Sequence, residues 1–351
     1  MAGSTFGERL KVTTFGESHG TAVGVIVDGV TPGVELDESY LQVQMDRRKP
    51  GQSSVTTPRK EEDKVTVLSG LYEGRTTGTP LCLLIGNRDS RPSAYNDIQE
   101  AFRPGHADYS YMAKYGLRDH RGGGRSSGRE TAARVAAGAV ARKLLEARGV
   151  SITAYTVEAA GIRCVRFVES AIEANPVRAC DPEAAIRMAE RIEAIAAQGD
   201  SCGGVVECRI RGAAPGLGEP VFDKLDAELA KAMLSIGAVK GIEFGEGFAA
   251  AGMLGSEHND PMNAQGFLSN HSGGILGGIS TGEEILFRVA VKPTSSISVP
   301  QPTVGTDGQE RVIQTRGRHD PCICPRIVPV VEAMACLVLE DHYKRQAALR
   351  A

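Results

Sequence analysis

The chain has 351 residues, of which 41% are hydrophobic, and it is therefore long and apolar enough to bury a substantial core. Forty basic residues against 43 acidic ones give a net charge of −3, which excludes the global positive field on which non-specific nucleic-acid binding depends. No apolar run approaches the roughly 20 residues of a membrane-spanning helix, and the first residues lack the apolar centre of an export signal. We expect a cytoplasmic globular protein with neither a membrane nor a nucleic-acid partner.

The eight cysteines are scattered along the chain, and without an export signal we expect them to be reduced thiols. The close pair Cys322 and Cys324 has no second pair at zinc-ligand spacing, so no metal site is expected.

Strand and helix patterns alternate irregularly along the sequence. Alternating or β-branched residues predict strands at 22–28, 64–69, 81–85, 151–157, 204–211 and 285–291. A period of 3.6 predicts helices at 127–148, 182–198, 222–236 and 325–348. Because regular βαβ units are missing, the order favours an α+β fold. Length alone suggests about two domains, but no linker supports a division, so we expect one domain over residues 1–351.

The tract 121–138, RGGGRSSGRETAARVAAG, sets glycines and serines between arginines and runs into a helix. A helix N-terminus has unpaired N–H groups and partial positive charge, and Arg121, Arg125, Arg129 and Arg134 add donors suited to phosphate and carboxylate. An anion site is one interpretation. The other is a capping box formed by Ser127 and Glu130, with the arginines merely solvated, and both can hold together.

Two histidines lie in glycine-flanked turns where they could transfer protons. His19 follows Gly16-Glu17-Ser18, and His106 lies between Arg103 and Asp108. A structural histidine is the alternative for each.

Other polar clusters have equally open interpretations. The basic run 46–51 is expected on a loop because Pro50-Gly51 interrupts it, and it could simply be solvated. Asp320, within Arg316-Gly-Arg318-His319-Asp320, could supply chemistry or cap the last helix. The run 292–296, KPTSS, could bind phosphate, although neither a P-loop nor a dinucleotide glycine motif is present.

Together these segments resemble the chorismate synthase family from about residue 10 almost to the C-terminus. GESHGTAVGVIVDGVTP, GRSSGRETAARVAAGAV and RHDPCICPRIVPVVEAM are similar to that family's three signatures, and RPGHADY, SIGAVKGIEFG, SNHSGGILGGIS and KPTSSISVP are similar to its other loops. The resemblance implies a layer of helices between antiparallel sheets and a homotetramer.

The resemblance also implies a reaction. Phosphate leaves 5-enolpyruvylshikimate 3-phosphate by 1,4-elimination to give chorismate, and reduced FMN is required although there is no net redox change. NADPH would act only indirectly as the reductant of the flavin. Because no reductase-like insertion is present, a separate flavin reductase is expected.

Roles carry over from the resemblance residue by residue. His19 would protonate the departing phosphate, His106 would keep the reduced flavin in its protonation state, and Asp320 would accept the remaining substrate proton. Ser18 and Ser127 would be hydroxyl partners in this relay. The expected substrate-binding residues are Arg48, Arg103, Arg129 and Arg318. The expected flavin contacts, some through backbone, are Arg125, Ser126, Ser127, Gly237, Ala238, Gly277, Lys292, Pro293, Thr294, Ser295, Ser296 and Arg318.

One position departs from the family. Ser54 stands where many members have arginine, which puts a phosphate or nicotinamide contact in doubt unless Lys49 or Arg59 replaces it.

Two other functions stay open on the sequence. A flavin oxidoreductase with net electron transfer would consume NAD(P)H stoichiometrically. An RNA-binding protein is suggested by the Arg/Gly tract but opposed by the net charge and by the 5% aromatic content without tryptophan.

Overall fold

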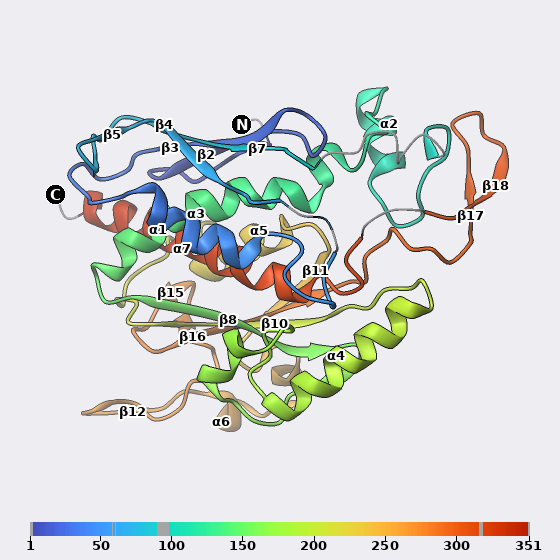
Figure 1. The fold of residues 1–351 in the computed structure, drawn as a ribbon. Coiled ribbons are helices and arrows are strands. Elements are labelled where there is room, and N and C mark those ends of the chain that lie inside the picture. The colour runs from blue at the N-terminus through green and yellow to red at the C-terminus, as the bar shows by residue number, and fades with distance from the viewer. Residues whose placement is uncertain (1–2, 58, 60, 90–97, 316–318, 350–351) are drawn as a thin grey trace.

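In the computed structural model, a layer of helices lies between two antiparallel sheets (Figure 1), as expected. The structure describes residues 3–57, 59, 61–89, 98–315 and 319–349. The first sheet has the strand order β1 (Thr5–Phe6), β2 (Lys11–Gly16), β3 (Ala22–Asp28), β7 (Leu81–Gly86) and β4 (Val65–Ser69). The second has the order β11 (Val239–Phe244), β16 (Ile285–Val291), β10 (Gly204–Arg211), β8 (Ser151–Ala159) and β9 (Ile162–Arg163).

The sheets turn apolar faces toward the helices because their strands alternate. In β3, Val23, Val25 and Val27 are fully buried while Ile26 is 41% exposed. The middle layer contains α1 (Glu38–Arg48), α3 (Thr131–Glu146), α5 (Leu225–Leu234) and α7 (Cys324–Leu349), and α4 (Pro182–Ala197) covers the outer face of the second sheet (Figure 1). One cluster of buried apolar residues extends from Leu10 to Leu339.

The shorter elements lie around these layers. They are α2 (Asp108–Tyr115), α6 (Gly255–His258), the hairpins β5–β6 (Leu71–Tyr72, Arg75–Thr76), β12–β13 (Met262–Asn263, Gly266–Phe267), β14–β15 (Ile275–Leu276, Ile279–Ser280) and β17–β18 (Gln301–Val304, Glu310–Ile313), and the 3-10 turns η2 (Gly124–Ser126), η3 (Gly128–Glu130), η4 (Glu169–Ala174) and η5 (Gly247–Gly252).

Helices α3 and α7 cross in close contact at the centre of the layer. A Cβ atom on Gly138 of α3 would lie 2.4 Å from the Cβ atom of Ala333 on α7, so glycine permits this approach. Nearly every residue of α7 from Cys324 to Asp341 is buried, which is typical of a helix surrounded by protein. The loops at one end of α3 and α7 are thereby held at fixed positions.

All six predicted strands and all four predicted helices are confirmed; β3, β10 and β16 have the predicted bounds, and the ends of the others are shifted. The helix predicted from residue 127 begins with the turn η3, and its regular part begins at Thr131. Asp181 caps α4 through the N–H groups of Glu183 and Ala184, with Pro182 in the first turn.

The prediction of a loop for the basic run 46–51 was wrong for its first half. Arg47 and Arg48 form the last turn of α1, where positive charge favours the carbonyl end of a helix, and Lys49 is the C-cap. Because the helix faces the core, Arg48 is buried rather than solvated.

Candidate active site

A cavity of about 1560 Å³ opens where loops from both sheets meet the ends of the central helices. Pockets for one small ligand occupy about 300–1000 Å³, so this volume has room for two ligands side by side. Most of the residues predicted for the site line it: His19, Arg48, Arg103, His106, Arg125, Ser126, Ser127, Arg129, Gly237, Ala238, Lys292, Pro293, Thr294, Ser295, Ser296 and Asp320.

His19 lies on the loop between β2 and β3 and contacts a glycine of the Arg/Gly tract. Its Nδ1 is 3.1 Å from Oγ of Ser18, which is buried behind the ring. A Cβ atom on Gly122, whose φ is +80°, would lie 2.4 Å from the same nitrogen. Burial lowers the pKa of His19 below 6.5, and the positive charges of Arg59 and Arg121 lower it further. In the absence of an anion, His19 is therefore predominantly neutral at pH 7.

His106 is held by a buried carboxylate two residues away. Its Nδ1 lies 2.9 Å from Oδ1 of Asp108, and the guanidinium of Arg103 donates to both oxygens of the same carboxylate at 2.8 Å. Burial alone would raise the pKa of Asp108, but the hydrogen bonds from Arg103 and His106 hold it well below its usual range. The Asp108 carboxylate thus fixes the orientation of both cavity-lining side chains.

Arg48 and Arg129 share one buried carboxylate, that of Asp63. Each guanidinium donates to a different oxygen of Asp63, and the three side chains are at most 3% exposed. Arg48 also donates to the Gly128 carbonyl at 3.0 Å, which ties α1 to η3. The side chains lie in place before any ligand arrives.

Asp320 lies near the start of α7 but does not cap it, because the helix begins at Cys324. Its Oδ1 accepts from the N–H of Thr57 at 2.9 Å, and its Oδ2 accepts from Arg326 at 2.6 Å. A carboxylate has about four lone-pair positions, so these two bonds leave room for a proton. The capping alternative for Asp320 is therefore wrong.

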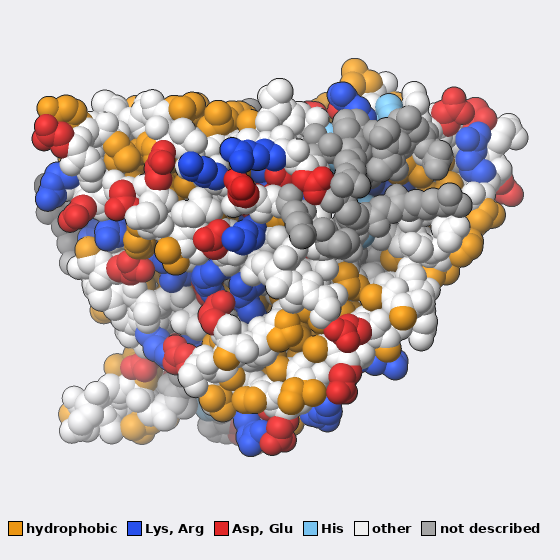
Figure 2. All heavy atoms as spheres, viewed as in Figure 1, with side chains coloured by type: hydrophobic (Ala, Val, Ile, Leu, Met, Phe, Trp, Pro, Cys, Tyr) orange, Lys and Arg blue, Asp and Glu red, His pale blue; other side chains and the backbone are white. Residues whose placement is uncertain are grey.

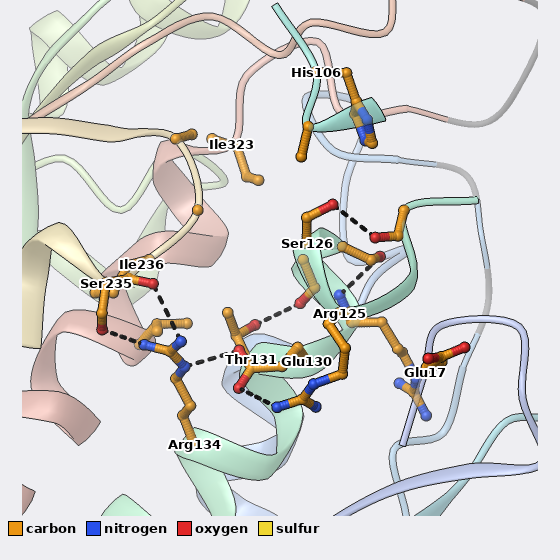
Figure 3. A pocket seen from close by; sticks show the side chains of 18 of the residues that line it. Glu17, His106, Arg125, Ser126, Glu130, Thr131, Arg134, Ser235, Ile236 and Ile323 are labelled. Carbon is orange, nitrogen blue, oxygen red and sulfur yellow. Dashed lines mark hydrogen bonds and ion pairs between the residues drawn. The ribbon is translucent and has the colours of Figure 1, made fainter. Parts of the chain in front are cut away.

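The capping box is only half formed. Ser127 caps η3 by accepting from the N–H of Arg129 at 3.2 Å. The carboxylate of Glu130 instead binds Arg134 at 2.8 Å, and Figure 3 shows Arg134 between Glu130 and Ser235. Arg125, Arg129 and Arg134 line the cavity, as the anion-site interpretation requires. Arg121 does not line it: its half-exposed side chain pairs with Asp119.

The residues expected to contact flavin come from three loops. The guanidinium of Arg125 donates to the carbonyls of Gly16 and Thr14, so its side chain braces β2. Lys292 donates to the Gly105 carbonyl at 3.0 Å and brings the loop after β16 against the loop that carries His106.

Four positions discussed from the sequence remain: Ser18, Gly277, Arg318 and Ser54. Ser18 does not line the cavity. Gly277 lies in the turn of the β14–β15 hairpin and does not line the cavity of the single chain. Arg318 lies outside the described residues. Ser54 donates to Glu193 of α4 at 2.6 Å, and of its two suggested substitutes Arg59 lines the cavity whereas Lys49 pairs with Asp46.

Sequence reasoning missed Asp63 and Arg326, and it assigned no role to His319 although that ring lines the cavity. Asp63 has a φ of +49°, unusual for a residue other than glycine, but no sequence pattern signals that conformation. Arg326 lies within the signature ICPRIVP, and its position there was the available signal.

The described residues contain no group of three or more His, Cys, Asp or Glu side chains that could hold a metal ion. On the face shown in Figure 2, basic and acidic side chains are interspersed. Among the described segments of the chain, no helix is long and apolar enough to cross a membrane.

An α+β fold whose cavity gathers arginines and histidines defines an enzyme that acts on a small anionic substrate. The comparisons identify which one. The family profile described as chorismate synthase matches residues 10–343. The chain is 55% identical to a chorismate synthase of Opitutus terrae, with 98% of both sequences aligned, and 57% identical to one of Syntrophobacter fumaroxidans, with 97% of both aligned. A crystal structure of a chorismate synthase superposes with a TM-score of 0.77 at 30% identity, over 97% of this chain and 93% of that one.

The chain belongs to the chorismate synthase family. It is a carbon–oxygen lyase, and its reaction is the 1,4-elimination of phosphate from 5-enolpyruvylshikimate 3-phosphate to give chorismate. The comparisons support this elimination rather than the alternative of a flavin oxidoreductase with net electron transfer.

Proposed function

We propose that the cavity holds 5-enolpyruvylshikimate 3-phosphate against reduced FMN, and that the chain's own residues supply the anion binding and the proton transfers. The observation that carries this proposal is that one cavity of about 1560 Å³ is lined by the predicted substrate residues Arg48, Arg103 and Arg129 and by nearly all the predicted flavin residues. That volume exceeds what one small ligand fills.

Arg48, Arg103 and Arg129 would bind the two carboxylates and the phosphate of the substrate, together with Arg318. A guanidinium has five N–H donors, so Arg48 and Arg129, which are fixed by Asp63, keep donors for a ligand among the described residues. Fixed donors lose little conformational freedom on binding, which favours tight and oriented capture of the anion.

His19 would protonate the departing phosphate, with Ser18 fixing its ring. Its lowered pKa in the absence of ligand is compatible with this role, because a phosphate dianion placed beside it raises the pKa of an imidazole. Binding of the substrate phosphate would thus favour the protonated form of His19, which is the form that can donate a proton.

Asp320 would accept the substrate ring proton, and the Ser127 hydroxyl would take part in the relay. Arg326 and the Thr57 N–H keep the Asp320 carboxylate in one orientation. His106, oriented by Asp108, would hold the flavin in its required protonation state.

The cavity fits a flavin on two structural grounds. Thr294 has a buried hydroxyl with no hydrogen-bond partner among the described residues, and Ala238 has a φ of +75°, a strained conformation found at ligand-binding backbone. The residues proposed to hold FMN are Arg125, Ser126, Ser127, Gly237, Ala238, Gly277, Lys292, Pro293, Thr294, Ser295, Ser296 and Arg318. When bound, the reduced flavin supplies electron density that loosens the ester C–O bond of the substrate.

We further propose one domain over residues 1–351 and a cytoplasmic homotetramer. The large buried apolar cluster, which extends from Leu10 to Leu339, supports one domain. The homotetramer is proposed from the chain's membership of the chorismate synthase family. NADPH would act only indirectly, through a separate flavin reductase.

An anaerobic assay with photoreduced FMN and the enolpyruvyl substrate tests the function. We expect orthophosphate and chorismate in a 1:1 ratio, with no stoichiometric consumption of reductant. Consumption of one NAD(P)H per product in a reductase-coupled assay would instead identify an oxidoreductase with net electron transfer.

A further inference from the structure

His319 lines the cavity one residue before Asp320, and one of its ring nitrogens lacks a partner. Its Nε2 has less than 1 Å² of exposed surface, and no described residue hydrogen-bonds to it. The neighbouring Asp320 carboxylate is directed to Thr57 and Arg326 instead. Buried polar atoms without partners are rare in proteins, and one that lines a cavity calls for a functional explanation such as a catalytic or ligand-binding role.

The His319 ring is neutral at physiological pH. Burial lowers its pKa, and the positive charges of Arg103 and His106 add to this against the opposing charge of Asp320, so that its pKa is about 4. Arg103 and His106, which act on the His319 ring, lie on the loop before α2, and Asp320 lies on the same loop as His319. A neutral imidazole forms one directional hydrogen bond from Nε2 and adds no charge.

The neutral ring of His319 differs in charge from the cavity arginines. The arginines are better suited to bind the carboxylates and the phosphate of the substrate, because charge-assisted hydrogen bonds are roughly twice as strong as neutral ones. A neutral donor or acceptor matches an uncharged ring edge, and the isoalloxazine of a flavin has such an edge with amide N–H and carbonyl groups.

We propose that His319 is a flavin-binding residue whose Nε2 hydrogen-bonds to the ring edge of FMN, while the substrate anions bind elsewhere in the cavity. This inference rests on the proposed function, in that it requires FMN to occupy the cavity. His319 would then complement His106, which approaches the same ligand with its carboxylate-oriented imidazole.

Flavin binding to the full-length protein tests the inference without any turnover. The variants are His319→Ala and His319→Asn, and the probe is FMN, titrated by quenching of its fluorescence. We expect His319→Ala to weaken FMN binding about tenfold, the equivalent of about 1.4 kcal/mol and of one neutral hydrogen bond. His319→Asn, which keeps a neutral hydrogen-bonding group, should recover most of the loss, and the KM for substrate at saturating FMN should stay within twofold.

A spectroscopic measurement on the unmodified protein covers the case in which a variant fails to fold. With ¹⁵N-labelled histidine, the Nε2 signal of His319 should show a neutral ring at pH 7 and should move on addition of FMN. His342 is the internal control, because it is also a buried histidine with unpartnered ring nitrogens but lies in the core on α7. Its signals should not move.

The results separate failure of this inference from failure of the proposed function. The proposed role of His319 is wrong if wild-type protein binds FMN but His319→Ala binds it equally well. It is also wrong if the Nε2 signal of His319 does not move on addition of FMN. A selective rise in substrate KM would likewise overturn it. If wild-type protein binds no FMN, the proposed function itself fails.

Discussion

Replacing Asp63 with asparagine tests whether one carboxylate holds the two substrate arginines in place. The change keeps the shape of the side chain but removes the charge facing Arg48 and Arg129, whose side chains are 1% and 3% exposed. Removing one partner of a buried ion pair leaves an uncompensated charge in the interior and costs about 3–5 kcal/mol. We therefore expect Asp63→Asn to lower the free energy of unfolding by about that amount.

The matched control is Asp46→Asn. Asp46 pairs with Lys49 at 2.9 Å, and both side chains are more than one-third exposed, so this pair should contribute less than about 1 kcal/mol. Urea unfolding followed by circular dichroism, at equal protein concentrations, measures both variants against wild type. A loss of less than about 1 kcal/mol for Asp63→Asn would refute the reasoning.

Acid titration provides a second test of the same ion pair. Burial alone would raise the pKa of Asp63, but Arg48 and Arg129 outweigh burial and hold it below 3.8. A carboxyl group whose pKa is lower in the folded state stabilises the fold above its unfolded pKa, and this stabilisation disappears as the pH falls through the folded pKa. The stability difference between wild type and Asp63→Asn should be constant above about pH 5 and shrink below pH 3.8. A difference that grows on acidification would contradict this assignment.

Three further predictions concern the cavity. His106→Ala and Asp320→Asn should lose about 10²–10⁴-fold in kcat in the fraction that remains folded, because each removes a group proposed to transfer or control a proton; near-wild-type turnover in either variant would refute its role. Arg48→Ala should raise the substrate KM more than the Kd for FMN in fluorescence titration, and equal losses would show that Arg48 is misassigned. Gly122→Ala should lower both melting temperature and activity, since the new methyl would lie 2.4 Å from His19, whereas Gly116→Ala, with φ +74° and nothing within 4 Å, should affect only the melting temperature.

The elements predicted most accurately from the sequence are strands in which buried and more exposed side chains alternate. The strands β3, β10 and β16 have the bounds that alternation and β-branching predicted, because each turns one face to the helical layer. The helix α1 was missed since only Leu41, Met45 and Arg48 on it are buried, and one of these carries a charge. The burial of Arg48 depends on its hydrogen bond to Asp63, which lies 15 residues further along the chain. Hydrophobic periodicity cannot detect such a contact.

In the candidate site, too, local contacts could be predicted from the sequence and long-range contacts could not. The contact of His106 with Asp108 is local, and its two-residue spacing was visible in the sequence. The contact of Asp320 with Thr57 joins residues 263 positions apart and depends on the packing of both sheets on α7. Most of the residues that line the cavity were therefore predictable from motifs, whereas the residues that orient them, such as Asp63 and Arg326, required the fold.

The central claim is that this cavity eliminates phosphate with a flavin that is not consumed. The most direct measurement is an anaerobic reaction in which the enolpyruvyl substrate is in 100-fold excess over enzyme and over photoreduced FMN, with orthophosphate and chorismate followed together. We expect many turnovers, equal amounts of both products and a flavin that is still reduced at the end. A reaction that stops after one equivalent of reduced flavin, or that releases no orthophosphate from folded protein, would contradict it.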